Sequence, residues 1–124
     1  MADAEPLGLL LISPGHERAH YAFLLAAGAA ALGRRVVLFA TNEGCRALLA
    51  ELPAAPREAD VVAAGVAGLG ELRNAAVELG VRMIACEAGL RVAGLAADAL
   101  LPGVEVAGVA SFLAAVSGGQ IVSL

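Results

Sequence analysis

Short, almost unbroken apolar runs alternate with longer Ala- and Leu-rich segments along this chain, and that alternation most constrains its fold. The runs Leu7 to Ile12, Val36 to Ala40 and Val81 to Cys86 have the length and composition of strands buried on both faces. Val104 to Ala107 and Ile121 to Leu124 repeat the pattern in shorter form. Strands separated by helices pair in parallel, because each helix serves as a crossover connection. The sequence therefore predicts an α/β fold, a three-layer α/β/α sandwich with a mostly parallel sheet of about five strands.

Helices are expected between these strands. Apolar spacing, helix-ending glycines and N-cap residues predict them over residues 17–32, 43–52, 88–97 and 109–116. A further helical pattern covers 61–79, although three glycines weaken its first half and leave 71–79 as the stronger part. Pro53 to Asp60 contains two prolines and mixed charge, and we expect an exposed connection there.

The length and composition favour one domain that associates with copies of itself. A chain of 124 residues has the usual size of a single domain, so we assign residues 1–124 to one. Hydrophobic residues make up 60% of the chain and aromatic residues only 3%, which predicts a core of Ala, Val and Leu. A small domain cannot hide that much apolar surface by itself. We therefore expect a homo-oligomer.

Charge and the terminal sequence argue against several classes of protein. The net charge of −4 provides no basic patch for nucleic acid. The longest apolar stretch, Tyr21 to Gly33, is shorter than the roughly 20 residues that a membrane span needs. The first residues have no cationic segment of the signal-peptide type, so a cytoplasmic location is expected. In a reducing compartment, the two cysteines should be thiols.

No cofactor is predicted from the glycine pattern. The glycine-rich stretch from Gly65 to Gly70 does not follow the first strand, as a dinucleotide-binding motif should. The turn after that strand contains only Gly15, and no phosphate-binding GxxxxGK[ST] motif occurs.

Cys86 is the residue most suited to chemistry. It ends one predicted strand and precedes a helix, where backbone N–H groups and the helix dipole stabilise a thiolate. His16 follows the first strand, and both residues fall at the carboxyl edge of the sheet, where sites of parallel sheets form. His16 and Glu87 are therefore candidate assistants, with His16 as a proton-transfer group. The alternative interpretation is that Cys86 is a small buried hydrophobe, as free cysteines often are.

The other cysteine and the two histidines give weaker evidence for a reactive thiol or a metal site. Cys45 lies one turn into its predicted helix, so it is expected to pack rather than to react. His16 and His20 share one helical face, but no carboxylate pattern completes a metal site and no CxxC motif exists. We expect no metal.

The segment from Gly80 to Leu113 resembles the DsrE/DsrF-like (DsrEFH/TusD-like) family of sulfur-relay proteins, and within it the DsrE-type proteins often labelled peroxiredoxin-like. The matching features are the strand ending in Cys86, a helix with a glycine at position 94, and the block from Gly103 to Leu113. The rest of the chain agrees more loosely, through 22–33 and the strand at 36–41. Relatives often carry an aromatic or apolar residue where this chain has Asn42 to Cys45.

The resemblance implies a sulfur carrier or sulfurtransferase in which Cys86 holds a persulfide and relays sulfane sulfur to a partner protein. It also implies a trimer or hexamer, and a rhodanese and a TusA-like carrier as partners. Two other functions stay open. One is a non-catalytic oligomeric binding or scaffold protein with a packed Cys86, and the other is a regulatory domain that binds a small molecule or nucleotide at the same sheet edge.

Overall fold

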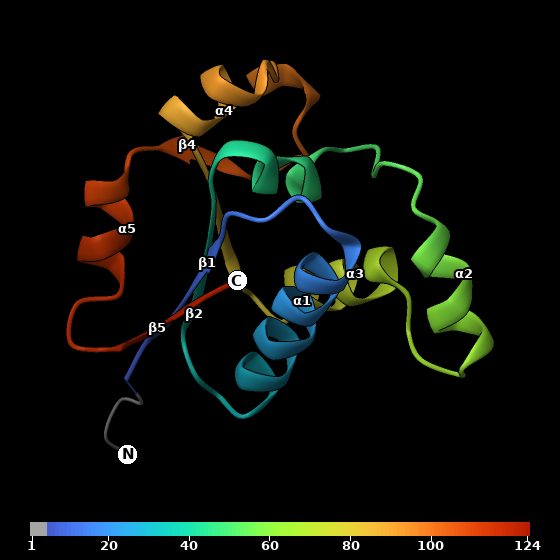
Figure 1. The fold of residues 1–124 in the computed structure, drawn as a ribbon. Helices are drawn as coiled ribbons and strands as arrows, with labels where there is room; N and C mark the ends of the chain where they lie inside the picture. The colour runs from blue at the N-terminus through green and yellow to red at the C-terminus, as the bar shows by residue number, and fades with distance from the viewer. Residues whose placement is uncertain (1–4) are drawn as a thin grey trace.

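Five short strands form one parallel sheet in the computed structural model, which describes residues 5–124 (Figure 1). The strands are β1 (Leu7–Leu11), β2 (Val36–Ala40), β3 (Arg82–Cys86), β4 (Glu105–Ala107) and β5 (Gln120–Ser123). Their order is β4-β3-β2-β1-β5, and every neighbouring pair is parallel. The predicted α/β fold with a parallel sheet is confirmed.

Helices cover both faces of the sheet and its carboxyl edge (Figure 1). They are α1 (His16–Ala31), α2 (Pro56–Ala63), α3 (Leu69–Glu78), α4 (Glu87–Ala93) and α5 (Val109–Ala115), with 3-10 helices η1 (Asn42–Leu48) and η2 (Ala97–Ala99). Helices α1 and α3 lie on one side of the sheet and α5 on the other, whereas η1 and α4 pack together beyond the strand ends. The predicted three layers are therefore present.

The alternation of side chains along β2 shows how the two faces are filled. Leu38 and Ala40 point into the core under α1 and α3, whereas Val37 and Phe39 point towards α5. On that second face, Phe39 stacks on Phe112 of α5, with ring centroids 4.9 Å apart. Because β2 is buried on both faces, it reads as a continuous apolar run in the sequence.

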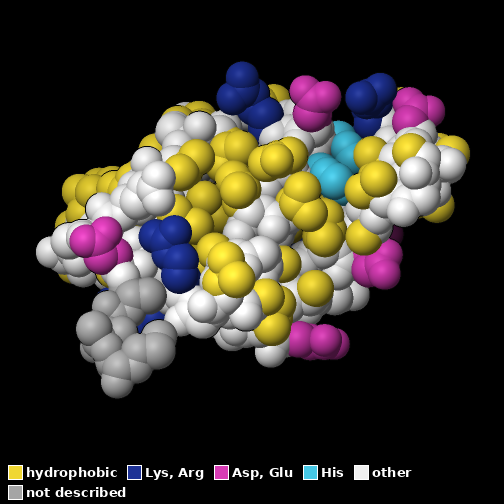
Figure 2. Space-filling model, turned by 90° about the horizontal axis from the view of Figure 1, so that it is seen from below, with side chains coloured by type: hydrophobic (Ala, Val, Ile, Leu, Met, Phe, Trp, Pro, Cys, Tyr) yellow, Lys and Arg dark blue, Asp and Glu magenta, His cyan; other side chains and the backbone are white. Residues whose placement is uncertain are grey.

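Much apolar surface is left outside these cores. Tyr21 and Leu24 of α1 are exposed, as are Leu32 just after that helix and Ile121 of the edge strand β5. Figure 2 shows apolar side chains spread over much of the face seen from below. The expectation that this chain cannot bury all its hydrophobic residues alone agrees with this surface, while its oligomeric state stays a prediction.

The helix predicted over 43–52 is wrong in type and extent. The structure has the 3-10 helix η1, which ends at Leu48. Beyond it the backbone bonds to the segment around η2 instead of to itself: the Leu101 N–H donates to Leu48 O and the Ala50 N–H donates to Ala99 O. Tertiary hydrogen bonds therefore replace the helical ones, which local sequence could not indicate.

The connection predicted over 53–60 is right only for its first residues. Helix α2 begins at Pro56, because proline fits the first turn of a helix, where its missing N–H costs nothing. The helical pattern predicted over 61–79 divides at Gly65, whose φ of 79° ends α2, and α3 starts at Leu69. In the same way Gly94, with φ of 70°, ends α4 earlier than the predicted residue 97.

Candidate functional site

The carboxyl edge of the sheet brings three strand ends side by side. The turn after β1 leads into His16, the turn after β2 leads through Thr41 into η1, and β3 ends at Cys86. Cys86 pairs in register with Ala107 of β4, so it occupies the last position of the sheet on its strand. The strand assignment thus places Cys86 where the sequence predicted it.

The Cys86 thiol lies at the start of α4. Its backbone is extended, with φ of −67° and ψ of 123°, and Cys86 is the N-cap residue of that helix. The Gly89 N–H donates a hydrogen bond to Cys86 Sγ at 3.4 Å. A sulfur atom in this position faces the unpaired N–H groups of the first helical turn, which stabilise negative charge.

The same thiol is largely covered. Cys86 is 8% exposed and packs in the apolar cluster that contains Phe39 and Phe112. The Cys86 side chain is therefore buried, with a polar contact to its sulfur from Gly89 and an apolar wall of Phe39 and Phe112.

Gly89 permits the close packing of α4 on the end of β2. A Cβ atom at Gly89 would lie 2.5 Å from Thr41 Oγ1 and would also collide with the backbone N of Asn42. Asn42 itself has a positive φ of 51°, in the left-handed region that asparagine tolerates. Sequence reasoning did not single out Gly89, although a glycine in the first turn of a predicted helix is the signal that could have found it.

Cys45 belongs to η1 and has no exposed surface. Its thiol donates a hydrogen bond to Ala40 O at 3.4 Å. Burial raises the pKa of the Cys45 thiol to about 11, and a hydrogen bond from the backbone N–H of Cys86 opposes this shift. The geometry favours packing over reaction for Cys45.

His16 is held on the side of the sheet that α1 and α3 cover. Its Nε2 is 2.7 Å from Glu58 Oε1, and its ring stacks on His20 with centroids 5.7 Å apart. The Nε2 of His20 is 2.8 Å from Ala67 O. Among the hydrogen bonds within residues 5–124 none joins His16 to Cys86, and Glu58, which sequence reasoning missed, is its partner instead. A proton-transfer role for His16 stays a prediction.

Glu87 pairs with a residue of its own helix. Its carboxylate accepts a hydrogen bond from Arg91 Nη2 at 2.8 Å, the usual i, i+4 pair on an exposed helix surface. A role for Glu87 at Cys86 also stays a prediction.

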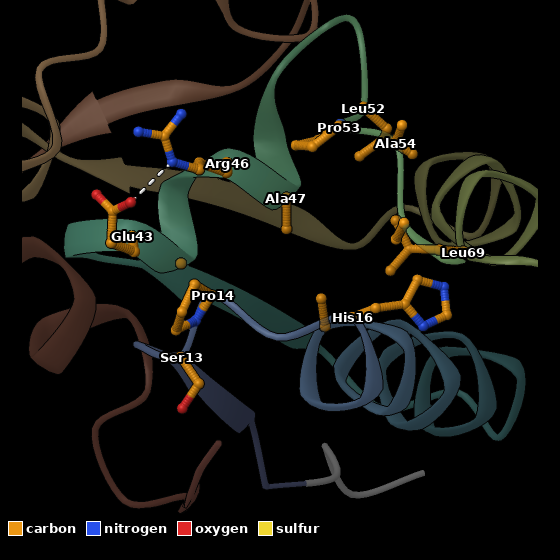
Figure 3. A pocket seen from close by; sticks show the side chains of 13 residues that line it. Ser13, Pro14, His16, Glu43, Arg46, Ala47, Leu52, Pro53, Ala54 and Leu69 are labelled. Atoms are coloured by element: carbon orange, nitrogen blue, oxygen red, sulfur yellow. Dashed lines mark hydrogen bonds and ion pairs between the residues drawn. The ribbon is translucent and has the colours of Figure 1, made fainter. Parts of the chain in front are cut away.

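A small cavity of about 110 Å³ opens between the turn after β1 and η1 (Figure 3). The polar side chains around it are Ser13, His16, Glu43 and Arg46. Arg46 donates to Glu43 Oε1 at 2.8 Å, so the two charges at its rim neutralise each other. Cys86 does not line this cavity, which therefore lies beside the thiol site and not over it.

Across residues 5–124 no group of three or more His, Cys, Asp or Glu side chains gathers as it would around a metal ion. Within the same range, no helix has the length and apolarity needed to cross a bilayer.

The model of the DsrE/DsrF/DrsH-like family matches residues 55–122, more than half of the chain and the part that contains Cys86. The chain therefore belongs to the DsrE/DsrF/DrsH-like family, as its sequence resemblance indicated.

Solved structures show the same fold. The ychN protein from E. coli is 12% identical with a TM-score of 0.75, and the match covers 98% of this chain and 100% of that one. The protein of unknown function MTH1491 from Methanobacterium thermoautotrophicum is 21% identical with a TM-score of 0.64, at the same coverage of both chains. At these identities the likeness concerns the fold alone. No curated protein matches the chain.

Proposed function

We propose that this protein is a sulfur carrier, a sulfurtransferase-like protein that holds a persulfide on Cys86 and relays the sulfane sulfur to a partner protein. The observation that carries the proposal is the hydrogen bond from the Gly89 N–H to Cys86 Sγ at the start of α4. This contact places the thiol among unpaired amides within the segment that the family model matches. We also propose that residues 1–124 form one domain.

The loading step is a nucleophilic substitution at sulfur. The Cys86 thiolate attacks the outer sulfur of a polysulfide or of a rhodanese persulfide. One S–S bond forms to Cys86 and the S–S bond of the donor breaks, and the donor's remaining sulfur leaves with the electron pair, as a shorter polysulfide anion or as the rhodanese thiolate. In the relay step, an acceptor thiolate attacks the outer sulfur in the same way, and Cys86 leaves as a thiolate.

The surroundings of Cys86 suit a protein acceptor. Apolar side chains stand exposed on the helices next to it: Val92 of α4, and Val109 and Leu113 of α5. An acceptor that covers this surface would bury apolar area next to Cys86, where its own thiol could exchange sulfur. We propose a homo-oligomer, a trimer or hexamer, and a TusA-like carrier and a rhodanese as the exchange partners.

A second candidate function is a non-catalytic binding or scaffold protein. The burial of Cys86 against Phe39 and Phe112 favours it, since a packed thiol of this kind serves as a small hydrophobe.

Sulfide release after loading distinguishes the two functions. The protein is incubated with polysulfide, freed of excess reagent and treated with dithiothreitol. The carrier releases about one equivalent of sulfide, and Cys86→Ser releases none, because serine keeps the N-cap position but cannot bind sulfane sulfur. Equal release from wild type and Cys86→Ser, or none from either, would favour the scaffold function.

A further inference from the structure

A second cleft, away from Cys86, lies between α2 and the body of the protein. Its volume is about 610 Å³, within the range of small-molecule sites. The side chains that matter to its chemistry are the aliphatic Leu52, Pro53, Val62 and Leu69 and the polar His16 and Glu58. Figure 2 shows the histidine side chains in a hollow flanked by apolar ones. We call it the α2 cleft.

A carboxylate already occupies the polar end of the α2 cleft. Glu58 Oε1 lies 2.7 Å from His16 Nε2 and accepts a hydrogen bond from the Leu69 N–H at 3.0 Å. Leu69 is the first residue of α3, a helix of ten residues whose N-cap, Gly68, offers no side-chain cap. A Cβ atom at Gly68 would collide with Glu58 Oε2, so the glycine leaves room for the carboxylate. The His16 imidazole and the Leu69 N–H at the start of α3 thus form a binding site for one carboxylate group.

The helix that supplies this carboxylate is weakly attached. None of the eight residues of α2 is buried. Within residues 5–124, its other polar contact with the body is an exposed pair in which Arg57 Nη2 and Glu17 Oε2 are 3.7 Å apart, and exposed ion pairs contribute little to stability. Pro53 precedes α2, and Gly65, with its positive φ, follows it. Glu58 is therefore the main polar contact that holds α2 over the cleft.

The lining limits the charge of any ligand. His16 and Glu58 are the titratable side chains among the residues that surround the α2 cleft, and the remaining lining is aliphatic or glycine. With Glu58 displaced, one imidazole and one helix start face the space, which suits a single negative charge. A phosphate-rich nucleotide would find no arginine or lysine there.

We propose that the α2 cleft binds a small amphipathic carboxylate, such as a medium-chain aliphatic acid, whose head group takes the place of the Glu58 carboxylate. The head accepts hydrogen bonds from His16 and from the Leu69 N–H, and the aliphatic tail lies along the side chains of Leu52 and Leu69. Helix α2 acts as a lid that opens when Glu58 is displaced. This site is separate from the sulfur chemistry proposed for Cys86 and does not depend on it.

Because Glu58 is tethered next to this binding site, it competes with any added carboxylate. The wild-type protein binds such a ligand weakly, since binding must first displace the internal group. Removal of the Glu58 carboxylate therefore strengthens binding, which is the opposite of the effect expected for an ordinary contact residue.

The test is an NMR titration of the full-length protein with octanoate, followed through backbone amide signals. Glu58→Ala is expected to bind octanoate at least ten-fold more tightly than wild type, with the Leu69 amide among the signals that shift. Asp60→Ala is the matched control, because it removes a carboxylate from the same helix that does not touch His16, and it should bind as wild type does. Acetate, without a tail, and octanol, without a charge, should bind Glu58→Ala at least ten-fold more weakly than octanoate.

Two results would overturn the proposal. One is a Glu58→Ala protein that folds but shows no saturable octanoate binding. The other is octanoate binding that is unchanged when His16→Ala is added to Glu58→Ala. If Glu58→Ala does not fold, amide hydrogen exchange in wild type decides: saturating octanoate must speed exchange in α2 relative to α3, and unchanged exchange refutes the lid.

Discussion

The backbone of Gly89 lies against Thr41, so close that a Cβ atom on Gly89 would stand 2.5 Å from Thr41 Oγ1. This contact fixes where α4 begins relative to the end of β2, and thereby where the Cys86 thiol lies. The Cys86 Sγ depends on the Gly89 N–H for its hydrogen bond, so one glycine serves both the packing and the site.

Gly89→Ala should therefore impair both stability and the site. The new methyl group forces α4 away from Thr41 and Asn42, and overpacking of this kind costs about 1–3 kcal/mol in the free energy of unfolding. Urea denaturation measures this loss, and sulfur loading of Cys86 should fall with it. Gly108→Ala is the control, because a Cβ there meets nothing within 4 Å and its φ is −93°. Equal stability of the two variants would contradict the packing account.

Cys45 should be unreactive in the folded protein. With a pKa of about 11, only about one Cys45 thiol in a thousand is a thiolate at pH 8. In the Cys86→Ser variant, which leaves Cys45 as the remaining thiol, iodoacetamide should react more than about 100-fold more slowly than with free cysteine. Denaturant should restore the ordinary rate. Reaction of the native variant within ten-fold of free cysteine would refute this assignment.

Arg73 should contribute strongly to stability through its buried hydrogen bonds. It is 5% exposed, and its guanidinium donates to the carbonyl oxygens of Ala47, Leu49 and Ala50 at the end of η1. Arg73→Met leaves these carbonyls without that donor, and we expect a loss of about 2–3 kcal/mol in urea denaturation. Arg91→Met, at a side chain that is 79% exposed, should change stability by less than about 0.5 kcal/mol. A loss of less than about 0.5 kcal/mol for Arg73→Met would contradict this account, because it would mean that water satisfies the three carbonyls in place of the guanidinium.

The contact between Glu58 and His16 should make stability depend on pH in the acid range. The hydrogen bond from the Leu69 N–H, and then that from His16, holds the pKa of Glu58 below its ordinary value of 4.5. A lowered folded-state pKa means that the stabilisation is complete above that ordinary value and is lost as the pH falls through the folded-state pKa. The stability difference between wild type and Glu58→Gln should therefore be larger at about pH 5.5 than at about pH 3. Asp60→Asn supplies the comparison, and a difference for Glu58→Gln that does not change with pH would refute the assignment.

The strands of the sheet could be predicted from the sequence, because a strand that is buried on both faces is a continuous run of apolar residues. The central strands β1 and β2 are read this way, and the strand that ends at Cys86 was located correctly for the same reason. The family model matches residues 55–122, which include the strand that ends at Cys86 but neither β1 nor β2.

The rest of the site depends on contacts between distant residues. Glu58 and His16 are 42 positions apart in the sequence. Pro56 lies in the predicted connection, although proline also suits a helix start. The segment after η1 is shaped by bonds to residues 99–101, which no local pattern reveals. The close approach of Gly89 to Thr41 likewise needs the folded chain to be seen.

The most direct test of the central claim is intact-protein mass spectrometry after incubation with polysulfide. Wild type, Cys45→Ser and Cys86→Ser are compared before and after dithiothreitol. We predict that wild type and Cys45→Ser each gain the mass of one sulfur atom, and that dithiothreitol removes this gain. Cys86→Ser should gain no mass. A reducible gain on Cys86→Ser equal to that of wild type, or no gain on any of the three, would contradict the claim.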